Sequence, residues 1–228
     1  GWRPGDNPED APNVGDSAAD RLPKLLPGIN LVHGLQGERR ETFDHNKRFL
    51  QRVYDEGLML RRINIRQVMA FAGTEMSDTG ADIAHDHNKR FKTYKREVRE
   101  EIDQPMLRRV APAGTVLPDV HMEYHEGGKT FGRQLGTYPL LVAVPGEHEL
   151  GTTMDVALVD HGYRSVTGVP HPLDPNTASM DELTALPGVG RSTAGNIVVN
   201  RPYASVGEMG VDADLSRFVA VDSMGSAD

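Results

Sequence analysis

Residues 183–198 read LTALPGVGRSTAGNIV, a stretch that predicts two short helices joined by a tight glycine turn. Ser179 and Glu182 precede the turn in the S-x-x-E spacing of a capping box, which places the start of the first helix just after Ser179. Pro187 ends that helix, and a second helix begins near Arg191. Apolar residues at helical spacing should pack the two helices together: Met180, Leu183 and Leu186 from the first, and Ala194, Ile197 and Val198 from the second.

The turn between these helices has the composition of an anion-binding site. Gly188 and Gly190 permit a turn that is too tight for side chains. The N–H groups of Gly190, Arg191 and Ser192 should point out of the N-terminus of the second helix, where the helix dipole favours an anion. A nucleic-acid phosphate is the anion that recurs along a polymer, so we predict backbone contacts that do not read sequence. The predicted contact residues are Gly188, Val189, Gly190, Arg191 and Ser192, and an ordinary helical hairpin is the alternative.

A longer string around this turn is similar to a known motif. It runs Asn176-Thr177-Ala178-Ser179, then Glu182-Leu183, then Leu186-Pro187-Gly188-Val189-Gly190. This string resembles the helix-hairpin-helix of competence-type DNA-binding proteins, which implies binding to DNA or RNA. Thr193 stands where relatives often carry Lys, and Gly210-Val211-Asp212 would be a second turn without its second glycine. One competent hairpin is therefore expected.

Composition limits both the chemistry and the location of the chain. The 228 residues carry a net charge of -8 and no Cys, which excludes disulfides, a thiolate nucleophile and cysteine-held metal sites within them. Lys and Arg total 19 against 18 Asp and Glu over residues 1–112, 3 against 7 over 113–172, and 3 against 8 over 173–228. The hairpin lies in an acidic segment, so docking of a protein partner is a further alternative.

No apolar run approaches the roughly 20 residues of a membrane span, and we expect a cytoplasmic protein without membrane contact.

The first half predicts two βα units after a loop over residues 1–24. Residues 28–34 form a short apolar run that suits a buried strand, and a helix follows over 42–56. A second strand is expected over 62–71, and a longer helix over 82–109. Each helix has an apolar stripe: Phe43, Leu50, Val53 and Tyr54 on the first, and Phe91, Tyr94, Val98 and Ile102 on the second. Consecutive βα units predict a parallel pair with a right-handed crossover, and because two strands cannot close a sheet, we expect the rest of this domain upstream in a longer chain.

From Pro112 onward the pattern is typical of an all-β module, because glycine and proline recur between short apolar runs. The runs are Thr115–Tyr124, Tyr138–Val144 and Met154–Val159. A length of about 60 residues suits a small β-barrel of a kind that often binds nucleic acid. The predicted fold class is thus α/β, then small all-β, then α. The corresponding domains are residues 1–112, 113–172 and 173–228.

Two strings of the first half carry a wider resemblance. Residues 23–34 read PKLLPGINLVHG, with Gly37-Glu38 soon after, and residues 61–67 read RRINIRQ. These strings resemble the last part of a radical SAM barrel, and the order of segments over residues 20–220 resembles archaeal radical SAM enzymes with a C-terminal helix-hairpin-helix motif. The resemblance implies the last βα units of a partial TIM-type barrel. It also implies a four-iron four-sulfur cluster in the full-length protein, whose three cysteine ligands this chain lacks.

The same resemblance implies a cofactor turn. In related enzymes a late strand ends in a G-x-P-G-E turn close to S-adenosylmethionine, which points to Gly34, Gly37 and Glu38 here. Gln36 replaces the proline of that pattern, and a later F-P-G-T turn reads FAGT at residues 71–74. The alternative is that the two glycines only let a strand turn into a helix.

The middle module is similar to the TRAM-type barrel that follows the radical domain in RNA methylthiotransferases. Gly132-Arg133, the run to Val144 and Leu150-Gly151 carry this likeness. It implies nucleic-acid contacts by Lys129 and Arg133, for which solubilising surface charges are the alternative.

Two further patterns have plain interpretations. His85 with His87, and His121 with His125, have spacings that do not favour a metal site, and none is predicted. The run Lys89–Arg96 mixes basic and aromatic residues and could follow a nucleic-acid backbone. The aromatic residues have core spacing, however, and Glu97, Glu100 and Glu101 offset the charge, so a solvated helix face is the preferred interpretation.

The sequence supports two hypotheses from different classes. The first is the C-terminal part of a radical SAM enzyme acting on nucleic acid, with the catalytic cysteines in an upstream part of the same enzyme. The second is an adaptor without catalysis, which binds nucleic acid or docks a protein. No nucleophile triad and no Walker loop accompany either one.

Overall fold

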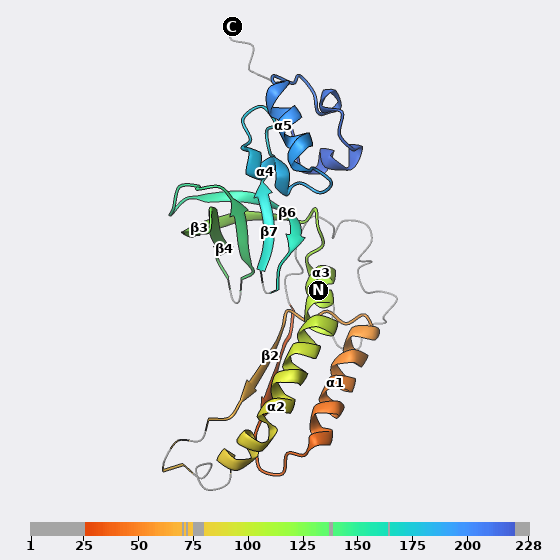
Figure 1. Cartoon of the computed structure of the whole chain (residues 1–228), viewed down its shortest axis with the longest axis vertical. Helices are drawn as coiled ribbons and strands as arrows, with labels where there is room; N and C mark the ends of the chain where they lie inside the picture. The colour runs from red at the N-terminus through yellow and green to blue at the C-terminus, as the bar shows by residue number, and fades with distance from the viewer. Residues whose placement is uncertain are drawn as a thin grey trace. The chain divides into compact units, whose positions relative to one another are not determined.

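A computed structural model describes residues 26–69, 71, 73–74, 80–136, 139–163 and 165–221 of the chain (Figure 1). These residues form two compact units, one within residues 23–110 and the other from Ala111 onward. The loop predicted over residues 1–24 and the start of the run at Tyr138 lie outside the described residues. Each unit has its own core and is taken in turn.

The first unit contains two βα units. Its elements are β1 (Gly28–His33), α1 (Arg40–Asp55), β2 (Arg62–Gln67), α2 (Gly80–Val98) and α3 (Gln104–Val110). The two strands pair in parallel, from Gly28 opposite Arg62 to His33 opposite Gln67, as the sequence predicts. The two long helices lie side by side and form contacts with each other (Figure 1). The described residues form a two-stranded sheet and do not close a TIM-type barrel.

Residues alternate along β2 between a buried face and an open one. Ile63 and Ile65 are buried, while Arg62 and Arg66 are exposed. The helices supply the rest of the core: Phe43, Leu50 and Val53 from α1, and Phe91, Tyr94 and Val98 from α2. On the open face the Nδ2 of Asn64 donates to the Oδ1 of Asn30 at 2.9 Å. The sheet thus has an apolar face in the core and a polar face outside it.

The long second helix differs from its prediction. Instead of one α-helix over residues 82–109, α2 passes through a π-helical turn at Arg99–Asp103 into α3. Pro105 explains the change, because it lacks an N–H and its ring would collide with the carbonyl one α-helical turn earlier. The N–H of Gln104 donates to the carbonyl of Arg99, five residues back, which widens the helix at this point. The second strand also ends earlier than expected, at Gln67 rather than near Phe71.

The second unit begins with the predicted small barrel. Its strands are β3 (Val116–Glu126), β4 (Lys129–Gln134), β5 (Leu141–Pro145), β6 (Thr153–His161) and β7 (Ser165–Pro170). They close in the order β3-β4-β5-β7-β6. The sequence pattern missed β4 and β7 because Gly132 and Gly168 interrupt them. A Cβ at Gly132 would lie 2.5 Å from the carbonyl oxygen of His121, so this glycine permits two strands to approach closely.

The helical segment packs directly against the barrel. It contains α4 (Met180–Ala185), α5 (Arg191–Val199) and two 3₁₀ turns, η5 (Val206–Met209) and η6 (Ala213–Arg217). One buried cluster joins barrel residues to helical ones: Ala157, Val159 and Val169 lie with Leu183, Leu186, Val189, Ile197 and Phe218. Barrel and hairpin therefore share a core. Of the helices that the structure describes, none combines the length and the apolar composition of a bilayer span.

Because the core is shared, we predict that a destabilising substitution in α5 also destabilises the barrel. Ile197 is buried, whereas Val199 in the same helix is 81% exposed. Ile197→Ala should lower the free energy of unfolding by about 2–5 kcal/mol, because it leaves a cavity. Hydrogen exchange should show reduced protection of amides in both α5 and β6. Val199→Ala is the control and should change the stability by about 0.5 kcal/mol at most. Loss of protection confined to α5 would contradict a shared core.

Candidate nucleic-acid interface

The capping box at the start of α4 is confirmed. The N–H of Glu182 donates to the Oγ of Ser179 at 3.2 Å, and the N–H of Ser179 donates to a carboxylate oxygen of Glu182 at 2.6 Å. The helix ends at Leu186, whose backbone is extended. Gly188 follows with a φ of +76°, in the left-handed region that favours glycine. The chain thus makes the tight turn that the sequence predicts.

The second helix begins with N–H donors for which the described residues supply no acceptor. Gly190 is the N-cap of α5, and its carbonyl accepts from the N–H of Ala194 at 2.9 Å. Among the residues that the structure describes, none accepts a hydrogen bond from the backbone N–H of Gly190, Arg191 or Ser192. Because these N–H groups lie at the positive end of a nine-residue helix, they suit an anion.

Gly190 has no conformational reason to be glycine. Its φ of −81° and ψ of 168° are open to any residue. A Cβ built at this position would meet no other atom within 4 Å, in contrast to the crowded Gly132. The space beside Gly190 is therefore free for an outside molecule to approach the backbone.

The other predicted contact residues divide into an anchor and an exposed pair. Val189 as a whole residue is 4% exposed and lies in the shared core, and its N–H donates to the carbonyl of Leu186 at 3.1 Å, so this predicted contact residue anchors the turn and is not placed to meet a ligand. Arg191 and Ser192 are exposed. Two other arginines of the helical segment hold the fold: Arg201 donates to the carbonyls of Pro175 and Ala178, and Arg217 lies 5.0 Å from the ring of Phe218.

A second turn faces the same hollow as the first. Gly210 has a φ of +63°, and Asp212 is the N-cap of η6. The carboxylate of Asp212 accepts from the N–H of Asp214 at 3.2 Å. A hollow of about 490 Å³ lies between the two turns, lined by Gly188, Val189, Gly210, Asp212, Asp214 and Arg217 among others. At the second turn a side-chain carboxylate thus caps the helix N-terminus, whereas no side chain caps the N-terminus of α5 among the described residues.

The two predicted contact residues on the barrel lie on β4. Arg133 forms an ion pair with Glu123 of the neighbouring strand β3. Lys129 is exposed at the start of β4, opposite Glu126. Each basic side chain therefore has an acidic side chain close by, an arrangement that also suits a solubilising surface.

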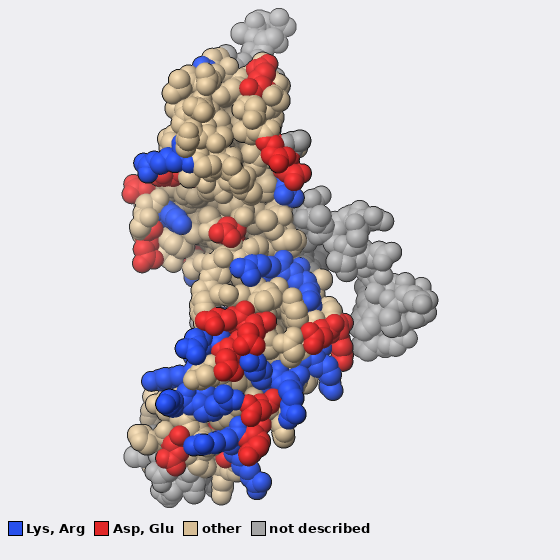
Figure 2. All heavy atoms as spheres, turned by 45° about the vertical axis from the view of Figure 1, so that its right-hand side comes forward, with Lys and Arg blue, Asp and Glu red and all other residues tan. Residues whose placement is uncertain are grey.

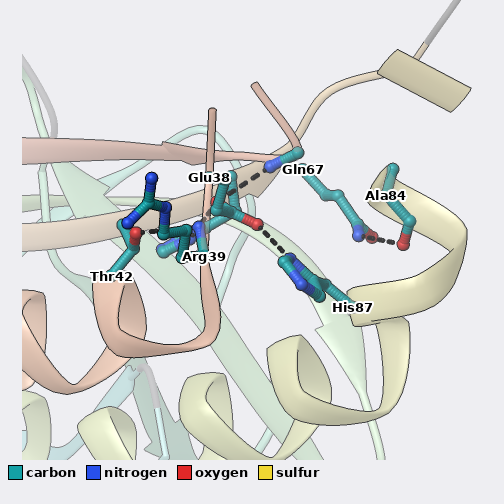
Figure 3. Close-up of polar contacts among 8 residues, drawn as sticks. Glu38, Arg39, Thr42, Gln67, Ala84 and His87 are labelled. Carbon is teal, nitrogen blue, oxygen red and sulfur yellow. Dashed lines mark hydrogen bonds and ion pairs between the residues drawn. The ribbon is translucent and has the colours of Figure 1, made fainter. Parts of the chain in front are cut away.

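The predicted cofactor turn is built around a buried carboxylate (Figure 3). The side chain of Glu38 is 4% exposed. One carboxylate oxygen accepts from the N–H of Gly34 at 3.0 Å and lies 2.9 Å from the Nδ1 of His33. The other oxygen lies 2.9 Å from the Nδ1 of His87, on α2. Glu38 therefore joins the end of β1 to α2.

The two glycines of this turn have different roles. Gly34 and Gly37 both have a positive φ, +86° and +83°. A Cβ at Gly34 would lie 3.1 Å from the Cβ of Ala84, so this glycine lets α2 approach the strand. Gln67, at the end of β2, donates to the carbonyl of Ala84 at 2.7 Å (Figure 3). These contacts lie at the carboxyl ends of parallel strands, where α/β proteins commonly bind ligands.

Sequence patterns did not single out His33, although it is the most enclosed polar residue of the turn. Its ring is fully buried and stacks on Phe43 at 4.5 Å between centroids. Phe91 and Tyr94 meet it edge-on. Burial lowers the pKa of the His33 imidazole, while the hydrogen bond and charge of Glu38 oppose this effect. His33 is thus held as a neutral ring in an aromatic enclosure.

In each histidine pair considered as metal ligands, one ring makes a polar contact within the protein. His87 bonds Glu38, and the Nε2 of His125 contacts the carbonyl of His148 at 2.8 Å. Within the described ranges, no group of three or more His, Cys, Asp or Glu side chains could hold a metal ion.

The buried ring predicts how the first unit responds to acid. Because the pKa of His33 is below its ordinary 6.5 in the folded state, the unfolded chain takes up this proton first. Stability should therefore fall as the pH drops through about 6.5 towards the folded-state pKa. Hydrogen exchange of β1 and α1 amides should show this loss. His33→Asn should weaken the dependence of folding stability on pH. His85→Asn, a substitution at an exposed position, should leave that dependence unchanged. An equally steep loss in His33→Asn would refute the assignment to His33.

Comparison with known proteins supports the local motif and finds long relatives. Residues 176–199 match the helix-hairpin-helix motif. A protein of Archaeoglobus fulgidus, whose name gives no function, is 45% identical over 189 residues, or 82% of this chain and 35% of its own length. A second archaeal protein, from Methanocaldococcus jannaschii and likewise named without a function, is 51% identical over 149 residues, or 64% of this chain and 27% of its own length. The chain thus spans about a third of the length of these relatives and carries a helix-hairpin-helix motif.

Proposed function

We propose that the turn between α4 and α5 binds the phosphate backbone of a nucleic acid. The supporting observation is the set of three N–H groups, of Gly190, Arg191 and Ser192, for which the described residues supply no acceptor. A phosphate oxygen can accept from such a set, and the helix dipole adds to the attraction. Amide groups that contact phosphate do not read bases, so this binding is independent of sequence.

Open space around Gly190 makes the proposal testable without loss of the fold. Gly190→Asp places a carboxylate where the phosphate would lie, and the new Cβ meets no atom of the chain. Affinity for a short DNA duplex, and for an RNA duplex of the same sequence, should fall at least about tenfold, the equivalent of about 1.4 kcal/mol. Fluorescence anisotropy measures this affinity, and circular dichroism should show an unchanged melting temperature.

Gly195 offers a matched control on the same helix. A Cβ at Gly195 also meets nothing within 4 Å, so Gly195→Asp makes the same change in charge away from the turn. This variant should bind both duplexes with nearly the affinity of the unchanged protein. Equal affinities in Gly190→Asp and Gly195→Asp would reject the phosphate site and leave the acidic hairpin as a surface for a protein partner.

We further propose that the chain acts as the C-terminal part of a radical SAM enzyme whose substrate is a nucleic acid. Two observations support this second candidate. The helices pack on the apolar face of the β1–β2 sheet, as the outer helices of an α/β barrel pack on its strands, and the other face of β2 carries Arg62, Asn64 and Arg66. The aligned stretches cover only 35% and 27% of the lengths of the two curated relatives, which leaves room for the remaining barrel.

The residues of this chain do not hold the cofactors of such an enzyme by themselves. The chain has no Cys, so the ligands of a four-iron four-sulfur cluster would lie in the upstream part of the enzyme. Both oxygens of Glu38 already have partners within the protein. In this proposal Glu38 shapes the turn, and Gly34 and Gly37 would border the S-adenosylmethionine through their backbone.

A full-length relative decides between an enzyme and an adaptor. The Archaeoglobus fulgidus protein, purified without oxygen, should show the visible absorption of a four-iron cluster and should cleave S-adenosylmethionine when reduced. Iron and sulfide analysis and product chromatography provide the two measurements. Absence of both the cluster and the cleavage would refute the enzyme proposal and favour an adaptor without catalysis.

A further inference from the structure

Helix α2 carries a row of basic side chains on one exposed face. The row consists of His85, Lys89, Lys92 and Arg96, which are spaced four, three and four residues apart and are all exposed. Residues at this spacing lie above one another on a helix. Among the described residues, no acidic side chain forms an ion pair with Lys89, Lys92 or Arg96. We call this set the α2 basic row.

Two of the three acidic residues that offset this run in the sequence, Glu97 and Glu101, form ion pairs with α1 in the structure. Lys47 of α1 contacts Glu97 at 3.2 Å and Glu101 at 2.8 Å. Arg90 pairs with Asp44 of the same helix α1. The carboxylates of Glu97 and Glu101 are thus engaged at the α1–α2 contact. Two exposed acidic residues, Asp86 and Glu100, remain on the outer side of the helix near the ends of the row.

The aromatic residues of the run take no part in its outer face. Phe91 is 8% exposed and Tyr94 is fully buried, and both pack in the core of the first unit. Neither ring can stack on a nucleic-acid base. A ligand of the α2 basic row would therefore meet neither of these two aromatic rings, which favours contact with phosphates over stacking on bases.

The two units of the chain differ in charge in a way that makes this row necessary. From Ala111 onward the chain has 6 Lys and Arg against 15 Asp and Glu, whereas residues 26–110 have 16 against 13. The amide groups of the hairpin carry no net charge, and electrostatic attraction to nucleic acid requires Lys and Arg. Figure 2 shows basic side chains gathered over the first unit and few over the helical segment.

We propose that the α2 basic row binds the phosphate backbone of a nucleic acid and supplies the electrostatic part of the affinity. This inference rests on the proposed function of the hairpin, because it assigns to the row the charge that the hairpin lacks. At 1.5 Å per residue the row extends about 17 Å, which is long enough for its side chains to contact more than one phosphate. The contact is sequence-independent and does not involve aromatic stacking.

The test compares the salt dependence of binding in four versions of the full chain. Lys89→Gln/Lys92→Gln/Arg96→Gln removes three charges from the row, and Arg40→Gln/Arg48→Gln/Arg108→Gln removes three exposed charges elsewhere in the same unit. The third version is Gly190→Asp, and the fourth is the unchanged protein. Affinity for a short DNA duplex is measured by anisotropy over a series of salt concentrations, and circular dichroism monitors folding.

The row variant should reduce the slope of log affinity against log salt by about 2–3, since each phosphate contact contributes about 0.9. The matched variant should reduce it by less than about 1, and Gly190→Asp should lower the affinity with little change in slope. An unchanged slope in the row variant, or an equal reduction in the matched variant, would overturn the inference. A change in slope in the row variant together with unchanged affinity in Gly190→Asp would instead overturn the hairpin proposal. An unchanged protein that binds no duplex would overturn both.

Discussion

Burial of Val189 fixes the direction in which the turn between α4 and α5 presents its backbone. The side chain lies in the core that joins the barrel to the helical segment. With that side chain directed inward and Gly188 in the left-handed region, the following N–H groups lie at the surface of the helix terminus. The hydrophobic core therefore does more than stabilise the second unit. It also holds in place the N–H groups of Gly190, Arg191 and Ser192, for which the described residues supply no acceptor. An isolated hairpin of six and nine helical residues is too short to maintain this arrangement.

A different constraint holds the first unit, where one carboxylate bonds two elements. Glu38 is almost fully buried, and its desolvation is offset by a backbone N–H and by the imidazoles of His33 and His87. Because His87 comes from α2, these bonds fix the helix against the end of β1. The polar edge of the sheet is thereby held by contacts within the protein itself. A ligand at this edge would meet Gln67 and the backbone of the glycine turn, with Glu38 already engaged in the protein.

Local signals in the sequence predicted the features that depend on neighbouring residues. The capping box of Ser179 and Glu182 acts over three residues, and the turn at Gly188 needs only the freedom of glycine. The parallel pairing of β1 and β2 also followed from the order of elements. By contrast, Glu38 and His87 are 49 residues apart, and their contact depends on how a helix packs on a strand. No periodicity or spacing in a single sequence contains that information.

Glycine shows most clearly why the same residue type needs different interpretations. Gly132 and Gly168 lie inside strands, at points where neighbouring atoms leave no room for a Cβ. Gly190 is the opposite case, since its surroundings and its dihedral angles would accept any residue. Composition alone cannot separate a glycine required by the fold from one that leaves room for a partner. The distance from a virtual Cβ to the nearest atom can.

The distribution of charge reconciles an acidic hairpin with a phosphate ligand. Total charge suggests that the segment from Ala111 onward repels nucleic acid, because Asp and Glu outnumber Lys and Arg by 15 to 6. Hydrogen bonds from backbone amides do not depend on that total, since they act over a single contact distance. Long-range attraction does depend on net charge, and it falls off over about 8–10 Å at ordinary salt. The short-range contact and the long-range attraction can therefore reside in different parts of one chain. In the proposal the contact lies at the glycine turn, and the attraction comes from a helix on which Glu97 is paired at the contact with α1 while the basic row is exposed.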